Sequence, residues 1–130
     1  MKLSLESAGA SHVIRGYAKG QVRVDDRVLT RSFLVAAQVL VADWPPQSLA
    51  ELRAEHLQQV ADLEPEILLL GVGTHQAFPP PAVLAPLYRR QIGIEVMTTD
   101  AACRTYNILR AEDRRVVAAL LLMLEEPPRH

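Results

Sequence analysis

The chain of 130 residues is long enough for one domain with a sizeable core, and its 49% hydrophobic and 22% charged residues exclude a disordered protein. A formal net charge of −1 argues against a dedicated nucleic-acid-binding protein. The single cysteine excludes an intrachain disulfide and a zinc site built on several cysteines.

No segment predicts a membrane span or a signal peptide. The longest uncharged apolar run, residues 116–124, is far shorter than the ~20 residues that a membrane-spanning helix needs. The N-terminal MKLSLESAGA holds one lysine and no long apolar run. We therefore expect a cytoplasmic protein that makes no membrane contact.

Residues 2–36 show patterns typical of β-strands. Leu3 and Leu5 alternate with polar neighbours, residues 12–18 can form a second strand, and residues 18–20 supply a turn. Val22 and Val24 alternate again, residues 25–26 make a further turn candidate, and Val28 opens the return strand. These patterns indicate antiparallel ribbons with one buried face.

A strand and a helix are predicted next. The apolar stretch at 33–42 is expected to bend or change partners and to end before Trp44, which two prolines follow. A helix is predicted to begin at Ser48, because Glu51 completes a Ser-x-x-Glu capping box. No second metal ligand is spaced to join His56 on this helix, so we expect a neighbour to bond one of its ring nitrogens.

The segment 66–115 contains a strand, a loop and a helix twice in succession. Apolar runs at 66–70 and 94–97 predict two strands, and this order makes them parallel neighbours. The helix between them is predicted at 82–91, with Gly93 as its stop. Both loops should then emerge at the same edge of the sheet, where open α/β folds hold ligands.

The second helix of this segment is predicted to begin at Asp100, with Thr99 as the alternative N-cap. Residues 116–123 predict a buried strand, and residues 125–130 a loose tail. The whole pattern predicts one α/β domain over residues 1–130. It is a compact layered domain with a mostly parallel or mixed central sheet, helices and a smaller antiparallel β element.

The first loop holds Gly71, Gly73, Thr74 and His75. Glycines after a strand let the backbone approach a ligand, and exposed amides can hold an anion. The dinucleotide pattern G-x-G-x-x-G is incomplete, and the Lys-Ser/Thr ending of a phosphate-binding loop is absent. A tight turn that needs positive φ is the alternative interpretation.

The second loop leads into a helix with reactive and charged side chains. Cys103 lies near the helix N-terminus beside Arg104, where a thiol can have a lowered pKa, although a small buried residue is the alternative. Arg104 and Asn107 project from one side of the helix and could hold a carboxylate, a phosphate or a protein carbonyl. The predicted ligand-binding residues are Gly71, Gly73, Thr74, Asp100, Cys103, Arg104, Thr105 and Asn107.

An enzyme is the rival hypothesis. Cys103 could act with His75, the only histidine expected at the same sheet edge, on an acyl or thioester substrate. A serine triad is disfavoured because no G-x-S-x-G occurs. We expect no metal site, because the four histidines are scattered and no H-x-x-x-H pair occurs.

The chain resembles a small single-domain α/β family of unknown biochemical function in three segments, EILLLGVGT, GIEVMTTDAACRTYN and NILRAEDRRVVAALL. The family is bacterial and archaeal, and its eukaryotic relatives include a mitochondrial assembly factor for respiratory complex I and a cytosolic adipogenesis-associated protein. Its most specific motif, T-x-A-A-C-R-T-Y-N, is present at residues 99–107. The resemblance implies a compact layered fold and no catalytic residues. It suggests that one set of residues acts together in folding or in binding: Gly71, Gly73, Cys103, Arg104, Thr105 and Asn107.

These observations predict a non-enzymatic binding or assembly module. Its expected site is a groove between the loop 71–75 and the helix from Asp100, where Arg104 would contact an anionic or carbonyl group and Asn107 would orient it. The expected partner is a protein or a small anionic ligand, and no cofactor is expected. A purely structural role for these residues is the third hypothesis, and the hydrophobic content is compatible with a homo-oligomer.

Overall fold

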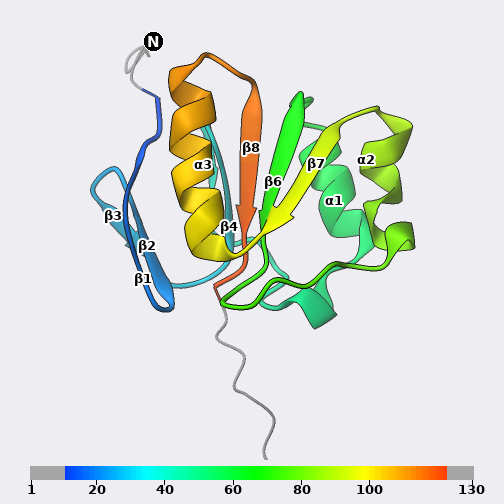
Figure 1. Cartoon of the computed structure of the whole chain (residues 1–130), viewed down its shortest axis with the longest axis horizontal. Coiled ribbons are helices and arrows are strands. Elements are labelled where there is room, and N and C mark those ends of the chain that lie inside the picture. The colour runs from blue at the N-terminus through cyan, green and yellow to red at the C-terminus, as the bar shows by residue number, and fades with distance from the viewer. Residues whose placement is uncertain (1–10, 123–130) are drawn as a thin grey trace, which may run out of the picture.

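The computed structural model describes residues 11–122, which form two sheets with helices packed against them (Figure 1). The larger sheet has five strands in the order β5-β4-β8-β6-β7, and the smaller has three in the order β1-β2-β3. The strands are β1 (Ile14–Ala18), β2 (Gln21–Val24), β3 (Arg27–Leu29), β4 (Phe33–Ala36), β5 (Val39–Val41), β6 (Ile67–Gly71), β7 (Gly93–Met97) and β8 (Val116–Leu120). The α-helices are α1 (Ala54–Ala61), α2 (Ala85–Arg89) and α3 (Thr99–Ala111), with short 3-10 helices η1 (Leu49–Glu51) and η2 (Pro81–Leu84).

The predicted fold class is confirmed. The larger sheet is mixed, because β6 is parallel to both β7 and β8 while β4 is antiparallel to both β5 and β8. The smaller sheet is antiparallel throughout. The predictions for Leu3, Leu5 and residues 125–130 concern positions outside the described residues.

The predicted pairing of the two parallel strands is also confirmed. β6 and β7 are adjacent, and their register runs from Ile67 opposite Gly93 to Gly71 opposite Met97. The apolar stretch before Trp44 changes direction as expected, because β4 and β5 form a hairpin. These strands were predictable because a run of apolar side chains can be buried only in the interior of such a sheet.

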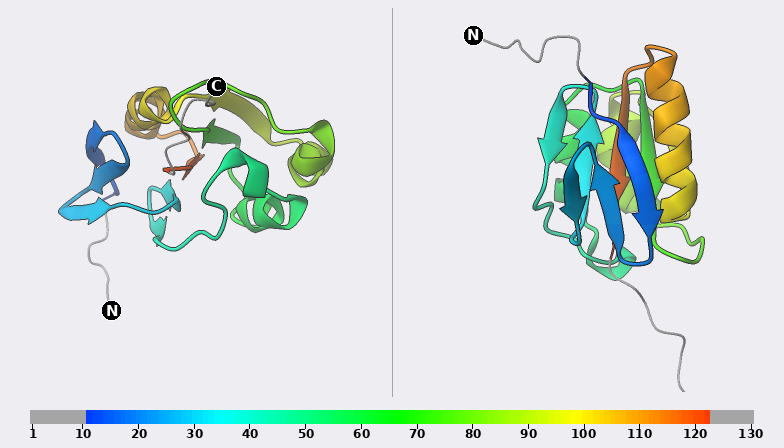
Figure 2. Two further views of the ribbon diagram at one scale, coloured as in Figure 1. Left: turned by 90° about the horizontal axis from the view of Figure 1, so that it is seen from below. Right: turned by 90° about the vertical axis from the view of Figure 1, so that its left-hand side faces the viewer.

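The larger sheet has a core on each face because successive strand side chains point to opposite sides. Leu68 and Leu70 of β6 pack with α1 and α2, whereas Leu69 packs with α3 and the smaller sheet. All three leucines are fully buried. Figures 1 and 2 show α1 and α2 grouped on one side, with α3 and β1–β3 on the other.

The smaller sheet completes the core under α3. Val22 and Val24 of β2 are fully buried and belong to the same cluster as Tyr106 of α3 and Phe33 of β4. Figure 2 shows β1 running alongside α3. β1 and α3 form the two walls of the candidate site.

The predicted capping box at Ser48 is wrong. Ser48 makes no side-chain cap bond, and the carboxylate of Glu51 accepts a hydrogen bond from the amide of Gln47 at 2.9 Å. Only a 3-10 turn forms there, because Leu52 turns to an extended conformation and its side chain enters the core. Burial of one leucine therefore outweighs the local capping preference.

The main helix, α1, begins after Arg53. The amide of Arg53 donates a hydrogen bond to Nδ1 of His56 at 3.0 Å. The expectation that a neighbour bonds this histidine is confirmed. Its ring also lies edge-on to that of Trp44, with 6.2 Å between the ring centroids.

Two further helix boundaries differ from the predictions. The stop after α2 is Gln91, which adopts a positive φ of 58°, whereas Gly93 already belongs to β7. The N-cap of α3 is Thr98 rather than Asp100 or Thr99. Both boundaries adjoin β7, whose pairing with β6 runs from Gly93 to Met97. Because this pairing fixes where β7 begins and ends, it also fixes where α2 must stop and where α3 can start.

Candidate functional site

The glycine turn after β6 uses its own amides within the fold. The amide of Val72 donates to the carbonyl of Met97 at 2.9 Å, and the amide of Gly73 donates to Oγ1 of Thr99 at 2.8 Å. Gly73 has a φ of 105°, which favours glycine. These two amides are therefore already paired and cannot hold an anion.

Thr99 joins three segments at this turn. Its Oγ1 accepts the hydrogen bond from Gly73 and donates one to the carbonyl of Leu121 at 2.9 Å, while its amide donates to the carbonyl of Gly73 at 2.9 Å. The residue is 1% exposed. The sequence indicated Thr99 as an alternative cap and as one of the polar residues of the second loop. A threonine between a strand and a helix does not indicate such distant partners.

Gly71 is required by the close approach of α3 to the sheet. A Cβ atom added at Gly71 would lie 2.8 Å from Cδ2 of Leu120 and 3.0 Å from Cα of Thr99. The latter atom belongs to the backbone, so a side chain could not be accommodated by rotation of a neighbour. The glycine turn and the start of α3 thus meet as predicted, in a tightly packed joint.

A groove lies along α3 on its other side, facing β1. Its volume is about 330 Å³, and it is lined by residues 14–17 of β1 and by Asp100, Cys103, Arg104 and Asn107 of α3. The structure thus brings together four of the eight predicted ligand-binding residues. The second wall is β1, whereas the sequence predicted the loop 71–75.

Arg104 extends into solvent at the mouth of this groove. Its side chain is 69% exposed, and its Nη1 lies 3.3 Å from Oδ2 of Asp100. The Asp100 carboxylate also accepts a hydrogen bond from Thr98 Oγ1 at 2.7 Å. The bond from Thr98 and the guanidinium of Arg104 together hold the pKa of Asp100 below its ordinary value despite the opposing effect of desolvation.

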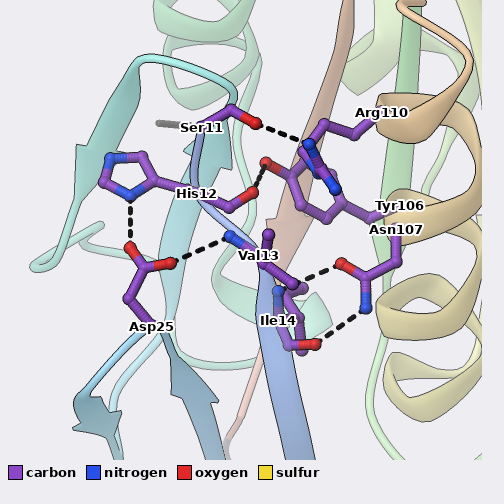
Figure 3. A network of polar contacts seen from close by, with 8 residues as sticks. All are labelled: Ser11, His12, Val13, Ile14, Asp25, Tyr106, Asn107 and Arg110. Atoms are coloured by element: carbon purple, nitrogen blue, oxygen red, sulfur yellow. Dashed lines mark hydrogen bonds and ion pairs between the residues drawn. The ribbon is translucent and has the colours of Figure 1, made fainter. Parts of the chain in front are cut away.

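Asn107 fastens β1 to α3 (Figure 3). Its Oδ1 accepts from the amide of Ile14 at 3.0 Å, and its Nδ2 donates to the carbonyl of Ile14 at 2.7 Å. The side chain thus pairs with the edge of β1 as a neighbouring strand would. The amide group that we expected to orient a ligand is occupied by this backbone.

Two more side chains of α3 extend this attachment toward the beginning of β1 (Figure 3). Tyr106 donates from its hydroxyl to the carbonyl of His12 at 2.9 Å, and Arg110 donates to the hydroxyl of Ser11. Tyr106 is fully buried, and no pattern in the sequence indicated that its hydroxyl would bond a distant carbonyl.

Asp25 secures the same segment from the smaller sheet (Figure 3). Its Oδ2 lies 2.7 Å from Nδ1 of His12, and its Oδ1 accepts from the amide of Val13 at 3.1 Å. Partial burial opposes ionisation of Asp25, but the hydrogen bonds from His12 and Val13 outweigh this effect and lower the pKa of its carboxyl.

Cys103 lies at the inner wall of the groove and is 3% exposed. Burial raises the pKa of its thiol to about 12, and Asp100 adds to the rise while Arg104 opposes it. His75 is exposed, and its Nδ1 lies 3.0 Å from Thr74 Oγ1. Between residues 11 and 122 no hydrogen bond joins Cys103 and His75, so these two side chains do not form the nucleophile–base pair that the enzyme hypothesis requires.

The remaining predicted residue, Thr105, uses its hydroxyl within α3, where it donates to the carbonyl of Ala101 at 2.9 Å. Among the described residues, no group of three or more histidine, cysteine or acidic side chains could hold a metal ion. No helix in that part of the chain is long and apolar enough to cross a membrane.

Comparison with known proteins places this geometry in a family. Residues 14–121 match the family described as "Protein of unknown function (DUF498/DUF598)". The chain belongs to this family. The matched range begins at β1 and ends just after β8, so both sheets and all three α-helices of the described structure lie within it.

Individual members of the DUF498/DUF598 family and their relatives agree with the resemblance read from the sequence. A crystal structure of a protein from Bordetella parapertussis has 42% sequence identity and a TM-score of 0.83, covering 88% of this chain and 98% of that chain. The "13 kDa major membrane protein" of Francisella tularensis is 27% identical over 93% of this chain and 99% of its own length. The "NADH dehydrogenase (ubiquinone) 1 alpha subcomplex assembly factor 3" of Drosophila melanogaster is 28% identical over 91% of this chain, which spans only 60% of that protein.

The packing at the glycine turn predicts a large effect of one methyl group. Gly71→Ala should lower the free energy of unfolding by about 1–3 kcal/mol, because the backbone of Thr99 blocks the new side chain. The matched control is Gly16→Ala, where the added Cβ meets no atom within 4 Å and the change should stay below about 0.5 kcal/mol. Urea unfolding followed by circular dichroism measures both. Equal effects would contradict the assigned role of Gly71.

The burial of Cys103 predicts slow alkylation. At about pH 8 the native thiol should react with iodoacetamide at least about 100-fold more slowly than the same thiol in the urea-unfolded chain, because little thiolate exists. Rates measured across pH give the pKa. An apparent pKa near ~8.5 would show a free thiol and revive the enzyme hypothesis.

The lowered pKa of Asp25 predicts pH-dependent stability. A carboxyl with a lowered pKa in the folded state stabilises it above the pKa of the unfolded chain, and this contribution disappears as pH falls through the folded pKa. Asp25→Asn should therefore cost up to about 1 kcal/mol near neutral pH and progressively less in acid. Urea unfolding at several pH values measures this dependence. Asp26→Asn, at the adjacent exposed carboxyl, is the control and should show a smaller effect at every pH.

Proposed function

We propose that this DUF498/DUF598 protein is a non-enzymatic binding or assembly module that contacts a protein partner through the groove between β1 and α3. The observation that carries this proposal is the exposed Arg104 at the mouth of a groove of about 330 Å³. The walls of that groove are held together by Asn107. A rigid groove loses little conformational entropy on binding, which favours recognition of a partner.

The charges of the groove favour an acidic or carbonyl group on the partner. Arg15 and Arg104 contribute two cations, and Asp100 contributes one anion. Arg15 is exposed, lies where the register of β1 shifts between Ile14 and Gly16, and has no ion pair within residues 11–122. Guanidinium groups bind carboxylates and carbonyls through directed hydrogen bonds.

The relatives support an assembly role. The Drosophila relative carries the name of an assembly factor for a subcomplex of NADH dehydrogenase, and its match covers nearly all of this chain. We infer by analogy that this protein also contacts other proteins during assembly, with a link to respiratory complex I. A cytoplasmic location remains a prediction, and the Francisella relative is named a membrane protein.

The cysteine enzyme is the weaker candidate. It would need a thiolate at Cys103 and a base at His75, but burial raises the thiol pKa to about 12 and the histidine side chain bonds Thr74. No observation specifically favours an acyl or thioester substrate. The purely structural hypothesis accounts for Gly71, Gly73 and Thr105, whose described contacts lie within the fold.

The test is affinity capture with the tagged protein at low and high salt. Arg104→Ala and Arg15→Ala should each reduce recovery of specific partners several-fold, and salt should reduce recovery by the wild type because the contact is ionic. Arg89→Ala changes an exposed arginine at the end of α2, outside the groove, and serves as the control. Circular dichroism should show an unchanged fold for all variants.

Two outcomes would contradict the proposal that the partner binds in this groove. The partners could be unchanged in Arg104→Ala and Arg15→Ala, or lost equally in Arg89→Ala. If the only recovered protein is a second copy of this chain, the groove is instead the interface of a homo-oligomer, which size-exclusion chromatography of the variants would confirm.

A further inference from the structure

A second and larger pocket lies at the opposite end of the central sheet. Its volume is about 490 Å³, and it is formed by the turn between β4 and β5, the loop before β6, the last turn of α3 and the first residues of β8. It shares no lining residue with the groove of the proposed function. Its occupation would therefore be independent of that function.

The pocket exists because β4 leaves the sheet early. The ladder between β4 and β8 ends at the pair Val35 and Ala118, although β8 begins at Val116. Ala37, which follows β4, would be the next residue to pair with β8. Its carbonyl accepts a hydrogen bond from the amide of His12 at 3.0 Å. Val116 therefore has no partner from β4 in the described part of the chain, and strand alternation directs its backbone groups to the same side as those of Ala118.

Two arginines lining this pocket have no carboxylate partner among the described residues. Arg110 donates to the hydroxyl of Ser11, and its buried Nε has no hydrogen-bond partner in that part of the chain. Arg115 donates from Nε to the carbonyl of Glu64 at 3.4 Å. Neither guanidinium makes an ion pair with any residue from 11 to 122, so no carboxylate of that range compensates either charge.

The other charges around the pocket largely cancel. Arg114 is paired with Glu66 at 2.9 Å, and Glu64 lies 3.5 Å from Arg90. Asp113, an exposed carboxyl, is the remaining acid in the lining. Two free guanidinium groups against one carboxylate leave about one positive charge, which favours a singly charged anion over a highly charged phosphate.

Much of the remaining wall is apolar. Val39 and Leu63 contribute apolar side chains to the lining, as do Ala36 and Val117. The volume lies within the range of roughly 300–1,000 Å³ that small-molecule pockets occupy. A ligand that fits must combine one anionic head with a short apolar body.

We propose that this pocket binds a monocarboxylate with a short alkyl chain. The carboxylate accepts hydrogen bonds from the guanidinium groups of Arg110 and Arg115, which make no ion pair within residues 11–122, and the alkyl chain lies against Val39 and Leu63. Charge-assisted bonds to guanidinium orient the head, and each buried methylene group of the chain adds to the affinity.

The experiment is a titration of the full-length protein with octanoate, followed by amide chemical shifts in NMR. Octanoate should shift the amides of residues 36–39, 63–64 and 116–117 in a saturable manner and leave those of residues 100–104 unchanged. Arg115→Gln should weaken binding about tenfold, because one charge-assisted pair is lost. Octanol, which has the same chain and no charge, should bind the wild type about as weakly as octanoate binds the variant.

Two further variants separate binding from folding. Ala37→Leu should reduce binding by filling the pocket while leaving every arginine in place, and Arg89→Gln, outside the pocket, should bind octanoate like the wild type. The proposal is overturned if octanoate causes no saturable shifts at these amides, or if Arg115→Gln and Ala37→Leu, both folded by NMR, bind as tightly as the wild type. It is also overturned if octanol binds as tightly as octanoate.

Discussion

The structure depends on one buried hydroxyl, that of Thr99, between the end of β6, the end of β8 and the start of α3. It accepts from Gly73 and donates to the carbonyl of Leu121, and the backbone of Thr99 packs so closely on Gly71 that no side chain fits there. These contacts set where α3 begins. Every residue of the candidate groove that α3 carries is positioned by that start.

The second constraint is the attachment of β1 along the length of α3. Asn107 replaces a missing strand partner for Ile14, and Tyr106 and Arg110 hold the segment that precedes it. A polar side chain that is fully paired within the fold cannot also orient a ligand without breaking those bonds. In the function we propose, recognition therefore falls to the exposed Arg104 and Arg15 and not to Asn107 or the buried Cys103.

This arrangement places a different cavity at each end of α3. Near its beginning, Arg104 is exposed beside the groove for which we propose a carbonyl or carboxylate of a partner. Near its end, Arg110 lies within a pocket that β4 opens by turning away from β8. The two sites follow from the same packing of one helix between two sheets, and neither needs a reactive thiol. The DUF498/DUF598 family, to which the chain belongs, is described as one of unknown function, and a Drosophila relative carries the name of an assembly factor.

The sequence by itself determined the strands, their parallel order and the mixed α/β architecture, because apolar periodicity and chain connectivity are local properties that burial enforces. It also located the glycine turn and the start of α3 at one edge of the sheet. Only the tertiary structure decided what Asn107, Thr99 and Ser48 do, because each is governed by a partner or a buried neighbour that the local pattern does not encode. Asn107 pairs with Ile14, 93 positions away, and Thr99 pairs with Gly73, 26 positions away. A polar side chain forms whichever hydrogen bond the packed core brings within reach, and that choice is made only when the distant segments meet.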